Sequence, residues 1–138
     1  MAEIGRLNSL EILHHTPQGF YLDGAEHGEI LLPSRYVTDS MKEGNMITVF
    51  VYRDSEDRLI ASTDRPKAIV GEFAGLKVTS VHPNVGAFLD WGLPKDLLLP
   101  YREQTKPARK DQIIVVRIIL DPKSERLVND PRWRVEHA

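Results

Sequence analysis

The 138-residue sequence contains no cysteine and no long apolar run. Without cysteine, a disulfide framework, a thiol nucleophile and a cysteine-ligated zinc site are all excluded. No run reaches the roughly 18 apolar residues of a transmembrane helix. Residues 1–13 lack the basic start and apolar stretch of a signal peptide. We therefore predict a soluble, cytoplasmic protein that makes no membrane contact, and its 41% hydrophobic and 28% charged residues are typical of a folded chain.

Charge is distributed unevenly along the chain. The whole sequence has 18 basic and 20 acidic residues, a net charge of −2. Residues 1–66 hold 6 basic and 11 acidic side chains (net −5), whereas residues 67–138 hold 12 and 9 (net +3). Any polyanion is therefore expected to bind the second half, unless the opposite charges serve to attract the two halves to each other.

The sequence repeats itself at a constant spacing. The matching pairs are 19–24 (GFYLDG) with 86–91 (GAFLDW), 30–33 (ILLP) with 97–100 (LLLP), and 54–59 (DSEDRL) with 121–127 (DPKSERL). The first two pairs are 67 residues apart, and the third differs by one inserted residue. A polar segment ending in Pro66 separates the copies, and proline ends regular pairing. We predict two domains, residues 1–66 and 67–138.

Each copy consists of short apolar or alternating runs between turn residues, a pattern that favours strands. In the second copy the expected strands are 68–81, 86–91, 96–100, 112–120 and 126–128. Only the connections 34–43 and 101–110 permit a turn or two of helix. Five strands with one long connection after the third are the layout of an OB barrel. The predicted fold is all-β, with two tandem five-stranded OB-fold barrels.

These motifs resemble a known family. Residues 70–73 (VGEF), 86–90, 97–100 and Asp121 with Arg126-Leu127 are similar to the S1 RNA-binding domain, an OB-fold family. The tandem arrangement, including 50–59 (FVYRDSEDRL), resembles the bacterial conserved virulence factor B family from about Gly5 to Val128. The resemblance implies binding of RNA or other single-stranded nucleic acid, with a regulatory role.

In S1-like domains an aromatic residue after Gly-Ala stacks on a base, which the resemblance transfers to Phe88 and to Tyr21. Strand alternation supports outward positions for both, because Leu89 and Leu22 are the natural core residues beside them. The alternative is that Phe88 packs on the neighbouring unit. Trp91 lies two residues after Leu89 and therefore faces the same side of the strand, which favours core or rim packing.

Two polar motifs complete the expected site. Asp121 and Arg126, matched by Asp54 and Arg58, form either a turn-fixing ion pair or part of the RNA face that the S1 resemblance implies. Five basic residues are expected to contact phosphates: Arg102, Lys106, Arg109, Lys110 and Arg126. The alternative for the first four, which lie in the connection 101–110, is an ordinary solvated loop. Arg132, Trp133 and Arg134 form a second basic group, in which Trp133 either stacks on a base or caps the barrel.

The S1 pattern is incomplete in both copies. Gln18 and Val85 stand where an aromatic residue often precedes the glycine, and Pro33 and Pro100 stand where a histidine often ends the third strand. The aromatic platform should therefore be small. The acidic first copy is the better candidate for a non-binding role, because it would repel phosphate.

No motif indicates catalysis, and we predict neither an enzyme nor a cofactor or metal site. The adjacent His14 and His15 would point to opposite faces of a strand, which suits surface positions rather than a metal site. The sequence thus predicts binding of single-stranded RNA, or single-stranded DNA, chiefly by the second unit. The competing prediction is a protein-interaction or self-association module.

Overall fold

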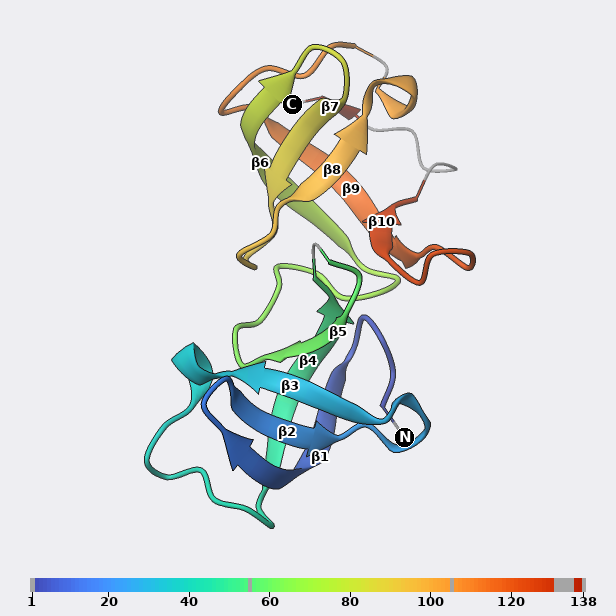
Figure 1. Cartoon of the computed structure of the whole chain (residues 1–138). Helices are drawn as coiled ribbons and strands as arrows, with labels where there is room; N and C mark the ends of the chain where they lie inside the picture. Colours follow the sequence, from blue (N-terminus) through green and yellow to red (C-terminus); the bar gives the residue numbers. More distant parts are fainter. Residues whose placement is uncertain (1, 55, 105, 131–135, 138) are drawn as a thin grey trace. The chain divides into compact units, whose positions relative to one another are not determined.

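The computed structural model describes residues 2–54, 56–104, 106–130 and 136–137, with side chains described up to residue 130 (Figure 1). The chain forms two compact units, Met1–Arg65 and Pro66–Ala138. The described residues form strands joined by turns and three short 3-10 helices. The predicted all-β fold with two five-stranded barrel-like sheets is confirmed.

The first unit is a closed barrel with the strand order β1-β2-β3-β5-β4. Its strands are β1 (Leu7–Thr16), β2 (Gly19–Asp23), β3 (Glu29–Pro33), β4 (Met46–Arg53) and β5 (Leu59–Ser62). All pairs are antiparallel except β3 with β5, which run parallel and close the barrel where Leu31 meets Ile60. The turn before β5 therefore lies beside the start of β3.

Alternation along these strands builds the barrel core. Leu22 in β2 and Ile30 and Leu32 in β3 are fully buried, with Leu31 between them less buried, whereas β4 is buried on both faces at the consecutive Phe50 and Val51. Successive side chains on a strand face opposite sides of the sheet, so the residues between Ile30 and Leu32 or beside Leu22 face outward. The core thus holds the outer face of β2 and β3 in a defined position.

The second unit repeats this arrangement in the sheet order β10-β9-β6-β7-β8. Its strands are β6 (Phe73–His82), β7 (Gly86–Asp90), β8 (Leu97–Pro100), β9 (Ile113–Leu120), β10 (Leu127–Asn129) and the short β11 (Glu136–His137), which pairs with β9. Within the described part of the chain, β8 and β10 lie side by side without a hydrogen-bonded ladder. Closure by hydrogen bonds is therefore seen in the first unit alone.

One predicted strand begins later than expected. The pattern indicated a strand from residue 68, but β6 begins at Phe73. The preceding residues form a turn in which the Glu72 backbone N–H donates to the Ile69 carbonyl at 3.0 Å and the Glu72 carboxylate accepts the Ile69 N–H, also at 3.0 Å. Gly71 has a φ of 90° in this turn, a conformation that favours glycine. Local turn chemistry thus outweighs the apolar pattern.

The connections after β3 and β8 each contain one turn of 3-10 helix, η2 (Ser34–Tyr36) and η3 (Tyr101–Glu103). A third such turn, η1 (Ala25–His27), joins β2 to β3. None of the helices formed by the described residues is long and apolar enough to cross a membrane.

Candidate nucleic-acid interface

Tyr21 lies on the outer face of the first barrel, as strand alternation predicts. Its side chain is half-buried, whereas the adjacent Leu22 is fully buried. The β1–β2 hairpin pairs Thr16 with Gly19 and, in the same register, His14 with Tyr21; the register becomes irregular only beyond His14. The two rings stack with centroids 5.1 Å apart and an interplanar angle of 17°. The Tyr21 hydroxyl donates a hydrogen bond to Gln18 Oε1 at 3.1 Å.

His14 also joins this aromatic pair to β3. Its Nε2 lies 2.9 Å from Glu29 Oε1, and both side chains are about half exposed, at 46% and 50%. His15, the next residue, instead packs edge-on against Phe20. The sequence predicted surface positions for the two histidines but not the contact of His14 with Tyr21. That contact depends on the pairing register of the β1–β2 hairpin, which was not assigned from the sequence.

A pocket of about 730 Å³ opens beside Tyr21 on the same face. Strands β2, β3, β4 and β5, the helix η1 and the β1–β2 and β4–β5 turns form it, and it is lined by Gln18, Tyr21, His27, Glu29, Leu31, Arg53, Asp54, Arg58, Leu59 and Ile60. In OB folds this face and these two turns form the usual site for oligonucleotides and oligosaccharides. The volume is within the range of small-molecule sites.

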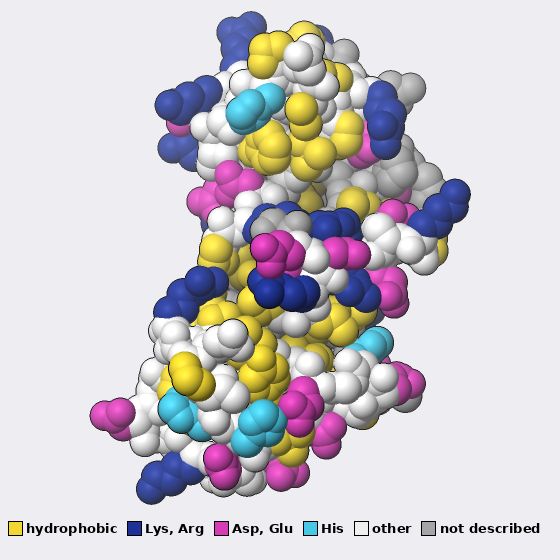
Figure 2. Space-filling view, viewed as in Figure 1, with side chains coloured by type: hydrophobic (Ala, Val, Ile, Leu, Met, Phe, Trp, Pro, Cys, Tyr) yellow, Lys and Arg dark blue, Asp and Glu magenta, His cyan; other side chains and the backbone are white. Residues whose placement is uncertain are grey.

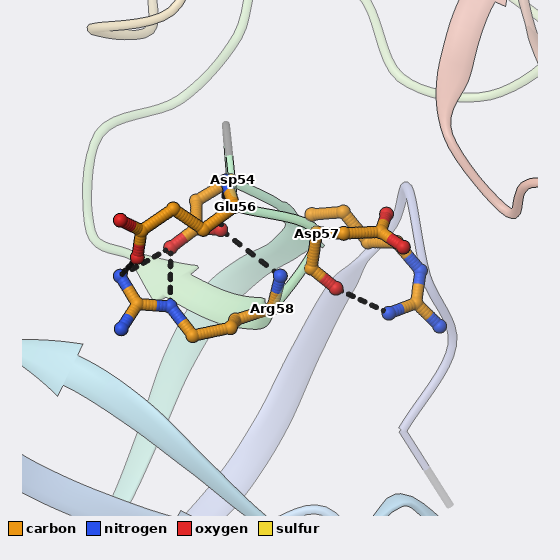
Figure 3. Close-up of polar contacts among 5 residues, drawn as sticks. Asp54, Glu56, Asp57 and Arg58 are labelled. Carbon is orange, nitrogen blue, oxygen red and sulfur yellow. Dashed lines mark hydrogen bonds and ion pairs between the residues drawn. The ribbon is translucent and has the colours of Figure 1, made fainter.

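The β4–β5 turn is held by a network around Asp54 (Figure 3). Asp54 Oδ1 accepts the backbone N–H groups of Glu56 and Arg58, each at 2.9 Å. Arg58 Nε and Nη2 approach Asp54 Oδ2, each at 3.1 Å, and Nη2 also approaches Glu56 Oε2 at 2.6 Å. The neighbouring Arg53 Nη1 donates to the Asp57 carbonyl at 2.9 Å. Of the two alternatives predicted for the Asp54–Arg58 pair, the turn-fixing ion pair is therefore present.

This network changes the acidity of Asp54. Partial burial by itself would raise the pKa of the Asp54 carboxyl. The backbone N–H groups of Arg58 and Glu56 and the Arg58 guanidinium stabilise the carboxylate more strongly, so the pKa lies below its usual value. Asp54 is therefore ionised at neutral pH and keeps the turn in one conformation.

The second unit places Phe88 on the equivalent outer face. Phe88 is half-buried between the fully buried Ala87 and Leu89, and pairs across the ladders with Ser80 and Leu98. The side chain of His82 packs edge-on against the ring at 5.0 Å. Figure 2 shows hydrophobic side chains gathered over β7 and β8 on the visible face of this unit.

This face is more apolar than its counterpart in the first unit. Leu98 is 36% exposed, and Val85 in the β6–β7 turn is 46% exposed. Asp96, at the position of Glu29, accepts a hydrogen bond from Thr79 Oγ1 at 2.7 Å. The first unit thus presents a polar pocket, and the second presents an aromatic ring among apolar neighbours.

Trp91 belongs to the interior of the second unit. Its side chain is 3% exposed, and its Nε1 donates to the Lys95 carbonyl at 2.6 Å. A tryptophan in this position cannot stack on a ligand without leaving its site. The interpretation from strand parity, which favoured packing, agrees with this position.

Asp121 and Arg126 lie in the β9–β10 turn, at the positions of Asp54 and Arg58. Asp121 Oδ2 accepts a hydrogen bond from Ser124 Oγ at 2.7 Å, and Oδ1 accepts the Lys123 N–H at 3.4 Å. The Ser124 hydroxyl, and then the Lys123 N–H, lower the pKa of this carboxyl. The turn is closed by the Asp121 N–H donating to the Arg126 carbonyl at 2.9 Å. Ser124 thus supports the aspartate within the turn.

The other basic residues predicted to contact phosphate all lie in the connection between β8 and β9. They are exposed and comprise Arg102, Lys106, Arg109 and Lys110. The Arg102 side chain is 84% exposed and lies 3.9 Å from Glu103 Oε2. The structure therefore divides the predicted phosphate contacts between this connection and the turn that holds Arg126. Arg132, Trp133 and Arg134 lie outside the described residues.

Among the described side chains, no group of three or more histidine, aspartate or glutamate residues could hold a metal ion. The candidate site therefore consists of aromatic, apolar and charged side chains on the outer face of each sheet.

Comparison with known proteins agrees with this geometry. The sequence model of the S1 domain matches residues 4–64, which is nearly the whole first unit. The chain resembles the S1-domain proteins. Among curated proteins, this S1-like chain is 28% identical over 138 residues to the uncharacterized protein YitL of Bacillus subtilis, covering 91% of the chain and 46% of that protein.

Two further proteins extend the S1-like resemblance. Conserved virulence factor B of Staphylococcus saprophyticus is 24% identical over 119 residues, covering 81% of the chain and 40% of that protein. A crystal structure of a multidomain protein with nucleic acid binding domains from Streptococcus pneumoniae superimposes with a TM-score of 0.76 at 19% identity. The match covers 92% of this chain and 45% of that one. The chain thus spans less than half the length of these relatives, and the structural match supports the fold.

Proposed function

We propose that this S1-like chain binds single-stranded RNA, with the second unit as the principal contact, and acts in the regulation of gene expression. The observation that carries the proposal is the outward position of Phe88 in the middle of β7, where an unpaired base can stack on the ring. Stacking of one base on an aromatic side chain contributes about 1–3 kcal/mol. The S1 likeness and the nucleic acid binding domains of the pneumococcal protein support the same function.

Charge supports the choice of the second unit. Residues 67–138 carry a net charge of +3, against −5 for residues 1–66. The exposed basic residues of the β8–β9 connection and Arg126 can neutralise phosphates along a strand that stacks on Phe88. Each neutralised phosphate contributes about 0.7 to the logarithmic salt dependence of binding to a single strand. Five such contacts give a slope of about −3.5, or about a hundredfold loss of affinity between roughly 50 and 200 mM salt.

The test is a titration of the full chain into fluorescently labelled single-stranded RNA, followed by anisotropy at these two salt concentrations. We expect saturable binding that weakens with salt and is weaker for a duplex of the same sequence, because paired bases cannot stack on Phe88. Labelled single-stranded DNA of the same sequence tests the preference for RNA. Absence of binding to several unrelated RNAs at the lower salt would contradict the proposal.

Phe88→Ala is the decisive variant, and Phe73→Ala is its matched control. Phe73 is 51% exposed at the start of β6 in the same unit. Loss of the Phe88 ring should raise Kd about fivefold to 150-fold, the equivalent of one stacked base. The Phe73 variant should bind like the parent. Equal binding by parent and Phe88→Ala would remove stacking from the mechanism.

A second candidate function is a protein-interaction module, favoured by the exposed Leu98 beside Phe88. An apolar interface responds little to salt, whereas a nucleic-acid contact responds strongly. The salt titration therefore separates the two functions. Self-association through this face would appear as concentration-dependent mass in analytical ultracentrifugation without RNA.

A further inference from the structure

The pocket of the first unit is poorly suited to a phosphate group. Arg58 already contacts the carboxylates of Asp54 and Glu56, and Arg53 donates to the Asp57 carbonyl. A second acidic residue, Glu29, also lines the pocket. To bind Arg58, a phosphate would have to displace the carboxylate of Asp54 or Glu56, and it would lie near the carboxylate of Glu29. The pocket therefore suits an uncharged part of a ligand.

The walls and floor of the pocket favour a flat ring. Tyr21 lines the pocket. His14 stacks on the Tyr21 ring but does not itself line the pocket. Leu31 pairs with Tyr21 across the β2–β3 ladder, and Ile60 pairs with Leu31 across the parallel ladder, so these two apolar side chains continue the surface beside the ring. A flat heterocycle in the pocket can lie against Tyr21 and rest on Leu31 and Ile60. Such an arrangement extends the His14–Tyr21 stack by one ring.

At Glu29, the edge of the pocket offers a hydrogen-bond acceptor to a ligand that donates hydrogen bonds. Glu29 Oε1 is hydrogen-bonded to His14 Nε2, and an ionised carboxylate has about four acceptor sites on its two oxygens, so both oxygens can accept a further bond. The side-chain oxygen of Gln18 is already occupied by the Tyr21 hydroxyl. Guanine presents two adjacent donors, N1–H and the N2 amino group, which match the two oxygens of a carboxylate. Uracil presents a single N–H between two carbonyl groups that the carboxylate repels.

We propose that the pocket of the first unit selects a guanine base, with Tyr21 stacking on the ring and Glu29 accepting hydrogen bonds from its Watson–Crick edge. His14 is a positioning residue, because it contacts both the Tyr21 ring and the Glu29 carboxylate. This inference rests on the proposed nucleic-acid function and assigns base recognition to the first unit. The acidic unit then has a binding role that its net charge alone does not predict.

The test uses single nucleosides, so that binding in the pocket is measured apart from RNA binding by the second unit. The full chain, labelled with ¹⁵N, is titrated with guanosine, inosine, uridine and guanosine 5′-monophosphate, and shifts of the amide signals of Tyr21, Leu31 and Ile60 are followed. Inosine lacks the N2 amino group and should bind at least about fivefold more weakly than guanosine, the lower limit for one well-placed bidentate contact. The monophosphate should bind no more tightly than guanosine.

Variants of the pocket separate stacking from selection. Tyr21→Ala should abolish the shifts, whereas Tyr21→Phe should keep them because the ring remains. Glu29→Gln should bring the guanosine-to-inosine affinity ratio close to one. Glu26→Gln is the matched control, because Glu26 is an exposed acid on η1 that does not line the pocket. A dispersed amide spectrum shows that each variant is folded.

Several results would overturn the inference. Equal binding of uridine and guanosine, or tighter binding of the monophosphate, would exclude guanine selection by Glu29. Tighter binding of arginine amide than of guanosine would assign the pocket to a cationic peptide side chain. A Phe88→Ala chain should still bind guanosine. In the parent chain, guanosine binding without RNA binding counts against the second unit's proposed role, and RNA binding without guanosine binding counts against the pocket.

Discussion

Gly19 is the residue whose substitution tests the fold most directly. It begins β2 with a φ of 143°, and a Cβ added there would lie less than 3.0 Å from the Leu32 carbonyl oxygen and 2.8 Å from the Ser34 nitrogen. Both of these are backbone atoms, which cannot rotate away as a side chain can. The same Ser34 N–H donates to the Gln18 carbonyl at 2.9 Å. Gly19→Ala must therefore push β3 away from β2.

The cost can be worked out by comparison with Gly44. At Gly44 φ is 88° and an added Cβ meets no atom within 4 Å, so Gly44→Ala carries only the left-handed backbone cost of about 1–2 kcal/mol. Gly19→Ala carries a similar backbone cost and loses at least two backbone hydrogen bonds, at about 1 kcal/mol each. We expect about 3–4 kcal/mol for Gly19→Ala. In a domain of this size that lowers Tm by about 12–30 °C.

The assay is thermal unfolding of the full chain, monitored by amide signals of the first unit. The second unit provides an independent repeat, because Gly86 has a φ of 142° and an added Cβ would lie 2.9 Å from the Pro100 Cα. Gly86→Ala should destabilise the second unit to a similar extent. If Gly19→Ala and Gly44→Ala lower the free energy of unfolding by amounts within about 1 kcal/mol of each other, the argument from close approach is wrong.

Three further predictions concern single side chains. Trp91→Phe removes the donor to the Lys95 carbonyl and should cost about 1–3 kcal/mol in chemical denaturation, with RNA affinity unchanged; a loss of affinity in folded protein would give Trp91 a binding role. Asp54→Asn should destabilise the first unit at pH 7, and the difference should begin to shrink below about pH 4 and be lost as the pH falls through the lowered pKa of the folded state, because a lowered pKa contributes stability only while the carboxyl is ionised; a difference that stays constant throughout this acid range would show that charge is not the cause. Lys106→Gln should reduce the salt slope of RNA binding by about 0.7, and an unchanged slope would exclude this side chain from the phosphate contacts.

Two features could be predicted from the sequence because they depend on local patterns: the two tandem units, and which side chains of a strand face the core. The 67-residue repeat predicted that the same succession of strands occurs twice along the chain. Alternation within each strand placed Leu22 and Leu89 inside and Tyr21 and Phe88 outside. The repeated glycines at 19 and 86 were visible as part of the motif. Their reason, the close approach of the next strand, is visible only in the structure.

The pocket beside Tyr21 could not be predicted in the same way. It combines residues from Gln18 to Ile60 that belong to four strands, two turns and the 3-10 helix η1, and its shape depends on the parallel pairing of β3 with β5. Side-chain alternation is a property of one strand, and it determines which face a residue occupies. The neighbours of that residue depend on registers between strands distant in sequence, which only the tertiary structure decides.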